Sequence, residues 1–209
     1  LLFVFAISGM GIYGMVLAGL ASNNKYSLMG GLRSSAQMIS YELTLGLSAL
    51  SVIVLTGSLN LVDMVHAQET VPFILVQPLA FILFFIAGIA ETNRAPFDLP
   101  EAEQELVAGF HTEYTGMKFA MFFMGEYINM VTMSALVTLL FLGGWNAYGL
   151  PLWSVLAFAI KVGFLLCVFI WLRSTFPRIR YDRLMTFGWK VLLPLCLLNL
   201  LVTSTFKVL

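Results

Sequence analysis

The sequence predicts an all-α fold: a polytopic bundle of about six transmembrane helices, with one acidic loop that contains a short helix on the cytoplasmic or matrix side. Three observations support this prediction. The 209 residues are 60% hydrophobic and 11% charged, with a mean hydropathy of +0.93, which is far more apolar than a soluble domain of this length. The apolar residues form runs long enough to cross a bilayer, and the basic residues occupy alternate connections.

A hydrocarbon core about 30 Å thick is crossed by roughly 20 apolar residues of helix. Runs of about this length predict crossings near residues 1–21, 36–56, 73–90, 117–142, 152–172 and 191–206. The first run has no initiator Met and no basic segment before it, so it is not expected to be a secretory signal. We expect a single bundle domain over residues 1–209, as a fragment that lacks upstream helices. Gly14 with Ala18, and Gly46 with Ala49, are expected to let helices pack closely.

The basic residues predict the orientation of the bundle. Lys25 and Arg33 lie in or next to the first connection, and Arg94 and Lys118 flank the third. The fifth connection holds a further group: Arg173, Arg178, Arg180, Arg183 and Lys190. The second and fourth connections hold none, so the positive-inside rule places the odd connections in the cytoplasm or matrix.

The composition argues against several classes of function. Acids and bases balance at 11 each, so no net charge favours nucleic acid as a partner. Cys167 and Cys196 lie within apolar runs, and His66 and His111 stand alone. No metal-ligand pattern is present in the sequence, so no metal or flavin site is expected in this chain.

Three ionisable residues fall inside the predicted crossings: Glu42, Glu126 and Lys161. Each costs at least about 2.5–3.5 kcal/mol at the centre of an isolated helix, so such residues normally face a protein interior or a water-filled cavity. We expect Lys161 to pair with an intramembrane glutamate such as Glu126. A purely structural salt bridge is the alternative to a functional role. Around Glu42, a polar stripe predicts an inner helix with two faces that need protein or water: Gln37, Ser40, Tyr41, Thr44, Ser48 and Ser51.

The third connection, "ETNRAPFDLPEAEQELVAGFHTEY", gathers most of the acids of the chain. Asp98 and Glu101, with Pro100 between them, resemble a capping box and predict the start of a short helix. Glu101 and Glu105 repel each other at i,i+4, and Glu103 adds a third negative charge. Clustered carboxylates raise one another's pKa and can hold protons, so the connection predicts a proton path that Glu42 and Glu126 extend into the membrane. A plain solvated acidic loop is the alternative.

The stretch from "ETNRAPFDLPEAE" to "MFFMGEY" resembles the signature of the quinone-chamber membrane subunit of respiratory complex I, the family of NADH dehydrogenase subunit 1 and its bacterial H counterpart. "SNNKYSLMGGLRSSAQMISYE" and "RIRYDRLMTFGWK" resemble two further motifs of this family in the same order. The similarity covers essentially the whole chain, although family members carry further helices upstream.

The resemblance implies specific roles for individual residues. It implies a hydrophilic funnel that includes Glu42, Glu101, Glu103, Glu105 and Glu126, and a chamber-facing loop with Arg94 and Asp98. We expect Lys161 to belong to the same proton relay, and Arg33 and Phe97 to belong to the quinone chamber. It also implies contacts of Arg173, Arg178, Arg180 and Asp182 with peripheral subunits.

The resemblance further implies a non-redox subunit of a proton-translocating NADH:quinone oxidoreductase, with quinone as the substrate and the iron–sulfur cluster in a partner subunit. Its partners would be other membrane subunits, the peripheral iron–sulfur and quinone-site subunits, and membrane lipid. Its location would be the bacterial plasma membrane or the mitochondrial inner membrane. Three alternatives stay open: the anchor of a related membrane-bound hydrogenase or formate hydrogenlyase, a transporter or channel, and a purely structural anchor.

Overall fold

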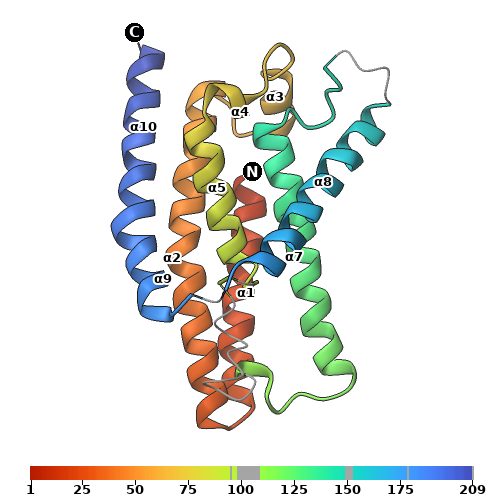
Figure 1. Ribbon diagram of the computed structural model, residues 1–209, viewed down its shortest axis with the longest axis vertical. Coiled ribbons are helices and arrows are strands. Elements are labelled where there is room, and N and C mark those ends of the chain that lie inside the picture. Colours follow the sequence, from red (N-terminus) through yellow and green to blue (C-terminus); the bar gives the residue numbers. More distant parts are fainter. Residues whose placement is uncertain (95, 98–108, 149–152, 178, 209) are drawn as a thin grey trace.

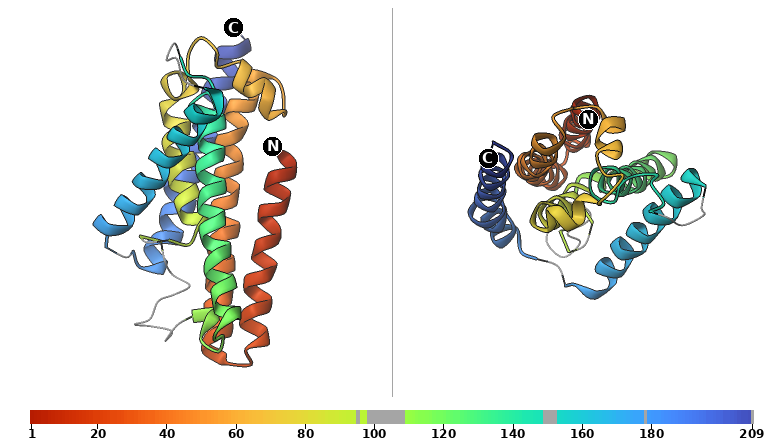
Figure 2. Two further views of the ribbon diagram at one scale, coloured as in Figure 1. Left: turned by 90° about the vertical axis from the view of Figure 1, so that its right-hand side faces the viewer. Right: turned by 90° about the horizontal axis from the view of Figure 1, so that it is seen from above.

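The computed structural model describes residues 1–94, 96–97, 109–148, 153–177 and 179–208. Every regular element in these ranges is helical, which confirms the predicted all-α class. The long helices run along the long axis of the molecule, and α8 crosses this direction obliquely (Figures 1 and 2).

Five helical stretches among the described residues are long and apolar enough to cross a membrane. They are α1 (Leu2–Ala21), α2 (Lys25–Thr56), α7 (Met117–Phe141), α8 (Ser154–Thr175), and the continuous stretch formed by α9 (Tyr181–Phe187), a π turn (Gly188–Leu192) and α10 (Leu193–Val208). The last stretch begins ten residues before the predicted run, because the segment that starts at Tyr181 is already helical. Its π turn ends two residues before Pro194, which has no N–H to donate within a helix.

The third predicted crossing differs from a single helix. It consists of α4 (Phe73–Val76) and α5 (Pro78–Glu91), which are separated at Gln77. Pro78 lacks an N–H and restricts the residue before it, which explains the break. The 14 residues of α5 span only about 21 Å at 1.5 Å per residue, which is less than the thickness of a typical hydrocarbon core.

The long helix α2 lies at the centre of the fold. It packs against α1, α5 and α10, and its buried residues Tyr41, Leu45 and Val52 join the hydrophobic core. The Asn24 side chain caps its first turn by accepting from the N–H of Tyr26. Gly57, at φ 77°, ends the helix in the left-handed conformation that glycine adopts most easily.

The two ends of the bundle carry different connections (Figure 1). The turn between α1 and α2 and the 3-10 helix Gly109–His111 lie at one end, which we call the loop end. The short helix α3 (Leu61–His66) and α4 lie at the opposite end, which we call the far end. The first connection that was predicted to face the cytoplasm or matrix lies at the loop end, and the third returns to this end at Gly109–His111.

Candidate functional site

The polar stripe of α2 holds the beginning of the acidic connection. The side chain of Gln37 is fully buried, and its Nε2 donates to the carbonyls of Ala90 at 2.9 Å and Phe97 at 3.0 Å. Further along the stripe, Tyr41 donates its hydroxyl to the Leu184 carbonyl at 3.0 Å, and Ser40 accepts from the indole of Trp189 at 3.2 Å. These contacts with the acidic connection and with the last helical stretch agree with the prediction of an inner helix.

The first turns of α2 hold the other end of the acidic connection. Ser27 donates its hydroxyl to the Phe110 carbonyl at 2.7 Å. Gly30 lies so close to the same turn that a Cβ on it would stand 2.9 Å from the Phe110 nitrogen and 3.0 Å from Gly109 Cα. One face of α2 therefore fixes residues on both sides of the acidic segment 98–108. Four predicted site residues, Asp98, Glu101, Glu103 and Glu105, and the predicted short helix lie outside the described residues.

Three carboxylates from three helices approach one region of the bundle. Glu42 stands near the middle of α2, Glu91 is the last residue of α5, and Glu126 lies in the first half of α7. Glu91 is only 3% exposed, and its Oε2 has no hydrogen-bond partner among the described residues. The charge of Glu42 interacts with that of Glu91. A negative charge on Glu91 is costly at this depth without a partner.

Glu91 and Glu126 line a cavity of about 490 Å³ between α1 and α7. Its walls are mostly apolar and include Phe3, Ile7 and Phe122. A smaller set of polar side chains also lines it: Ser8, Thr92, Asn93, Asn129 and Thr132. A space of this size can hold several water molecules where polar groups are present to bind them. The cavity therefore joins the end of α5 to the interior of α7, and its polar side chains are the groups that could bind water there.

Arg94 links the acidic connection to α7. Its guanidinium lies 3.2 Å from the Glu126 carboxylate, and the two side chains are only 6% and 9% exposed. The same guanidinium stacks over the ring of Tyr127 at 4.6 Å and faces Phe123 at 5.8 Å. Glu126 therefore has a basic neighbour from the connection itself.

The expected pairing of Lys161 with Glu126 is wrong. The Lys161 ammonium donates to the carbonyls of Leu142 at 2.7 Å, Gly144 at 3.0 Å and Asn146 at 2.6 Å. These carbonyls follow the C-terminus of α7, where the helix dipole attracts a positive charge. Since 16 residues separate Leu142 from Glu126, the two sites are about 24 Å apart along the helix. The structure does not bring Lys161 together with Glu126.

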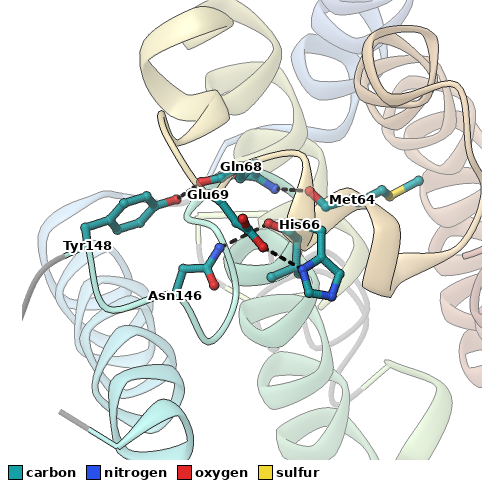
Figure 3. Close-up of polar contacts among 7 residues, drawn as sticks. Met64, His66, Gln68, Glu69, Asn146 and Tyr148 are labelled. Carbon is teal, nitrogen blue, oxygen red and sulfur yellow. Dashed lines mark hydrogen bonds and ion pairs between the residues drawn. The ribbon is translucent and has the colours of Figure 1, made fainter.

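Polar contacts close the far end of the bundle around Gln68 (Figure 3). The fully buried side chain of Gln68 donates to the carbonyls of Met64 at 3.1 Å and Leu139 at 3.0 Å. Tyr148 donates its hydroxyl to the Gln68 carbonyl at 2.9 Å, and the Asn146 amide donates to the Val65 carbonyl at 3.1 Å. These contacts, with the Lys161 ammonium beside the Tyr148 ring at 5.1 Å, tie α3, α7 and α8 together.

The other predicted site residues lie in different surroundings. Phe97 is buried in the core against Tyr41, and the guanidinium of Arg33 lies 5.8 Å from the ring centre of Tyr181. The predicted partner contacts Arg173, Arg180 and Asp182 are exposed, and Arg173 lines a small groove with Arg94. Arg178 lies outside the described residues. Among the described residues, no group of three or more His, Cys, Asp or Glu side chains is placed to hold a metal ion.

The sequence prediction missed Glu91 as a site residue. It counted Glu91 as the first acid of the third connection, although Glu91 is the last residue of the apolar helix α5. The sequence did contain a signal: Glu91 follows an uninterrupted apolar run and stands three residues before Arg94.

Comparison with known proteins identifies relatives of this chain. The family model described as NADH dehydrogenase matches residues 1–204. Among curated relatives, the H subunit of NADH-quinone oxidoreductase from Protochlamydia amoebophila is 57% identical over 205 residues, 98% of this chain and 62% of the relative. The corresponding protein of Geobacillus thermodenitrificans is 55% identical over 209 residues, 99% of this chain and 63% of the relative.

A third relative, the H subunit of NADH-quinone oxidoreductase from Paramagnetospirillum magneticum, is 54% identical over 208 residues, 98% of this chain and 61% of the relative. The chain thus spans about three fifths of the length of the curated relatives it matches. The resemblance noted in the sequence is confirmed: the chain belongs to the NADH dehydrogenase family.

Proposed function

We propose that this chain is part of the H protein, a membrane subunit of a proton-translocating NADH:quinone oxidoreductase. The names of its relatives support this assignment. The observation that carries the proposal is that Glu91 and Glu126 line one cavity, with Glu42 close enough to Glu91 for their charges to interact. The cavity lies where Gln37 of α2 holds the start of the acidic connection. In this role the chain carries no redox centre, and the electrons come from an iron–sulfur cluster in a partner subunit.

We propose that quinone reduction is coupled to the protonation of carboxylates in this chain. Reduction of a quinone to a quinol takes two electrons and two protons, so it draws protons from groups near the quinone chamber. We assign the chamber side of this chain to Arg33, Arg94, Phe97 and Asp98. Arg94 then has two roles, because the guanidinium that faces the chamber also neutralises Glu126 at 3.2 Å.

A charge change in the chamber alters how strongly Arg94 holds Glu126. That alters the proton affinity of Glu126, since an opposite charge within about 4–6 Å favours the ionised carboxyl. Through the cavity, Glu126 and Glu91 exchange protons by way of bound water, and Glu42 responds to the charge of Glu91. The acids of the connection, Glu101, Glu103 and Glu105, extend the relay toward the chamber.

The proposed assembly places the chain between the membrane arm and the peripheral arm. Arg173, Arg178, Arg180 and Asp182 would meet peripheral subunits. The five long apolar stretches would be embedded in lipid and in neighbouring membrane subunits, in the plasma membrane of a bacterium or the inner membrane of a mitochondrion. We do not include Lys161 in the relay, because its ammonium is bound by the end of α7.

The test uses the whole complex with single substitutions in this chain. Glu42→Gln and Glu91→Gln remove a proton-carrying group and keep the size of the side chain. We expect assembled complexes whose quinone reductase turnover and proton pumping are both reduced. Glu69→Gln, at an exposed position of the far end, is the matched control and should behave as wild type. Full pumping at normal turnover in both Glu42→Gln and Glu91→Gln would refute the proposal.

The hydrogenase-type anchor is the alternative from the same lineage, and the names of the relatives described above do not favour it. Purification separates the two assignments. A quinone oxidoreductase should bind a quinone photolabel in the acidic connection, whereas an anchor of a hydrogenase should not.

A further inference from the structure

We propose that Gly9 of α1 is a positioning residue for the Glu42 carboxylate. The inference rests on the proposed proton relay and deepens it. Gly9 lies on the helix that faces Glu42, and its missing side chain leaves the space that the carboxylate occupies.

The geometry at Gly9 is specific to the carboxylate. A Cβ on Gly9 would stand 2.8 Å from Oε1 of Glu42, 3.6 Å from its Cδ and 3.7 Å from its Oε2. Real Cβ contacts essentially never fall below 3.0 Å, and ordinary contact begins at 3.4 Å. The carboxylate would therefore have to retreat if Gly9 gained even a methyl group.

Other glycines between α1 and α2 have a different role. A Cβ on Gly19 would meet the Ser27 carbonyl at 2.9 Å, and a Cβ on Gly31 would meet the Met15 carbonyl at 3.0 Å. These glycines let the two backbones approach each other. At Gly9 the three nearest atoms all belong to the Glu42 carboxylate, so the space there serves one functional group.

The position of this carboxylate matters for the relay. Glu42 is half-buried, and its charge interacts with that of Glu91. Ser8, which precedes Gly9, lines the cavity that Glu91 and Glu126 share. Gly9 thus keeps the carboxylate at the edge of this cavity. A bulkier residue would turn it along α2, away from α1.

The test is Gly9→Ala in the assembled complex. Alanine is the best helix former, so the change does not weaken α1 itself. Because displacing a reacting group by about 1 Å can cost roughly a hundredfold in rate, we expect proton pumping and turnover to fall by about tenfold for this smaller shift. The quinone KM should stay unchanged. The matched control is Gly46→Ala in α2, where a Cβ would have no neighbour within 4 Å in the described part of the chain, and it should behave as wild type.

Two double variants separate positioning from packing. Glu42→Asp shortens the side chain by one methylene, so Gly9→Ala with Glu42→Asp should recover activity relative to Gly9→Ala alone. In a Glu42→Gln background, Gly9→Ala should add no further loss. If Glu42→Asp does not repair the loss of activity or assembly caused by Gly9→Ala, Gly9 only packs helices and the inference is overturned.

The outcomes also separate this inference from the relay itself. Full activity in Glu42→Gln would overturn the proposed function. Reduced activity in Glu42→Gln, together with wild-type activity in Gly9→Ala, would overturn the positioning role alone.

Discussion

The buried ion pair between Arg94 and Glu126 permits a quantitative prediction. At 3.2 Å, two unit charges attract each other by roughly 5 kcal/mol at an effective dielectric constant of about 20. Arg94→Met or Glu126→Met leaves the other charge buried without this attraction, and breaking such a pair typically costs about 3–5 kcal/mol. Changing both residues to Met removes both charges, and apolar replacement of a buried pair is often neutral. We therefore expect two destabilised single variants and a double variant close to wild type.

The two cysteines of the chain allow a direct assay. Cys196 is buried, whereas Cys167 is exposed. In a Cys167→Ser background, a thiol-specific fluorophore therefore reports unfolding when it reacts with Cys196 during heating in detergent. For a chain of this size, each kcal/mol of lost stability lowers the unfolding temperature by about 2–4 °C. The unfolding temperature of each single variant should therefore fall by roughly 10 °C.

The double-mutant cycle decides whether the two side chains act as a pair. A double variant that recovers most of the lost stability shows a coupling energy of several kcal/mol. Additive losses would show that Arg94 and Glu126 are held by separate neighbours, and this would refute the link between the acidic connection and α7. A parallel cycle with Lys161→Met and Glu126→Met should show no coupling.

Two further predictions concern the supports of the site. Gly30→Ala should destabilise the chain by about 1–3 kcal/mol relative to Gly46→Ala, because a Cβ on Gly30 overpacks the contact with Phe110. Both glycines lie within α2, so the effect on helix propensity is the same. Equal unfolding temperatures of the two variants would contradict the close contact with Phe110. Lys161→Met should lower the stability of the chain by about 1.5–3 kcal/mol, because the hydrogen bonds of the ammonium are lost. Assembled complexes with this variant should keep their ratio of protons pumped to quinone reduced. A lowered ratio would place Lys161 in the relay.

Much of the fold could be predicted from the sequence, because apolar length is a direct requirement of a bilayer. The predicted helix boundaries were wrong where a proline or a short helical segment determined the local structure. Pro78 divides the third crossing into two helices, and the helix beginning at Tyr181 extends the last one into the basic connection. Neither effect changes the hydropathy of the segment, so a search for apolar runs does not detect it.

The glycines illustrate a second limit. Gly14 and Gly46 were expected to allow close packing, yet a Cβ on either would have no neighbour within 4 Å among the described residues. The close approaches occur instead at Gly19, Gly30 and Gly31. Spacing along one helix identifies small residues, but it does not show which of them faces another helix.

The candidate site was predicted only in part for the same reason. Glu42 and Glu126 were identified because a carboxylate inside an apolar run is costly. The partner of Glu126 was wrongly predicted, because opposite charges in two sequence runs do not reveal their depth in the bundle. Lys161 lies at the far end with the carbonyls of α7, and Arg94 reaches Glu126 from the connection. Glu91 was missed because it sits at the boundary between a crossing and a loop.

The central claim is that the carboxylates share a wet cavity inside the bundle. A high-resolution cryo-electron microscopy map of the intact complex tests it most directly. We expect ordered water molecules in the cavity between α1 and α7 that connect Glu91 to Glu126 by hydrogen bonds. Density for an acyl chain or for apolar side chains filling this space, with the two carboxylates isolated from each other, would contradict it.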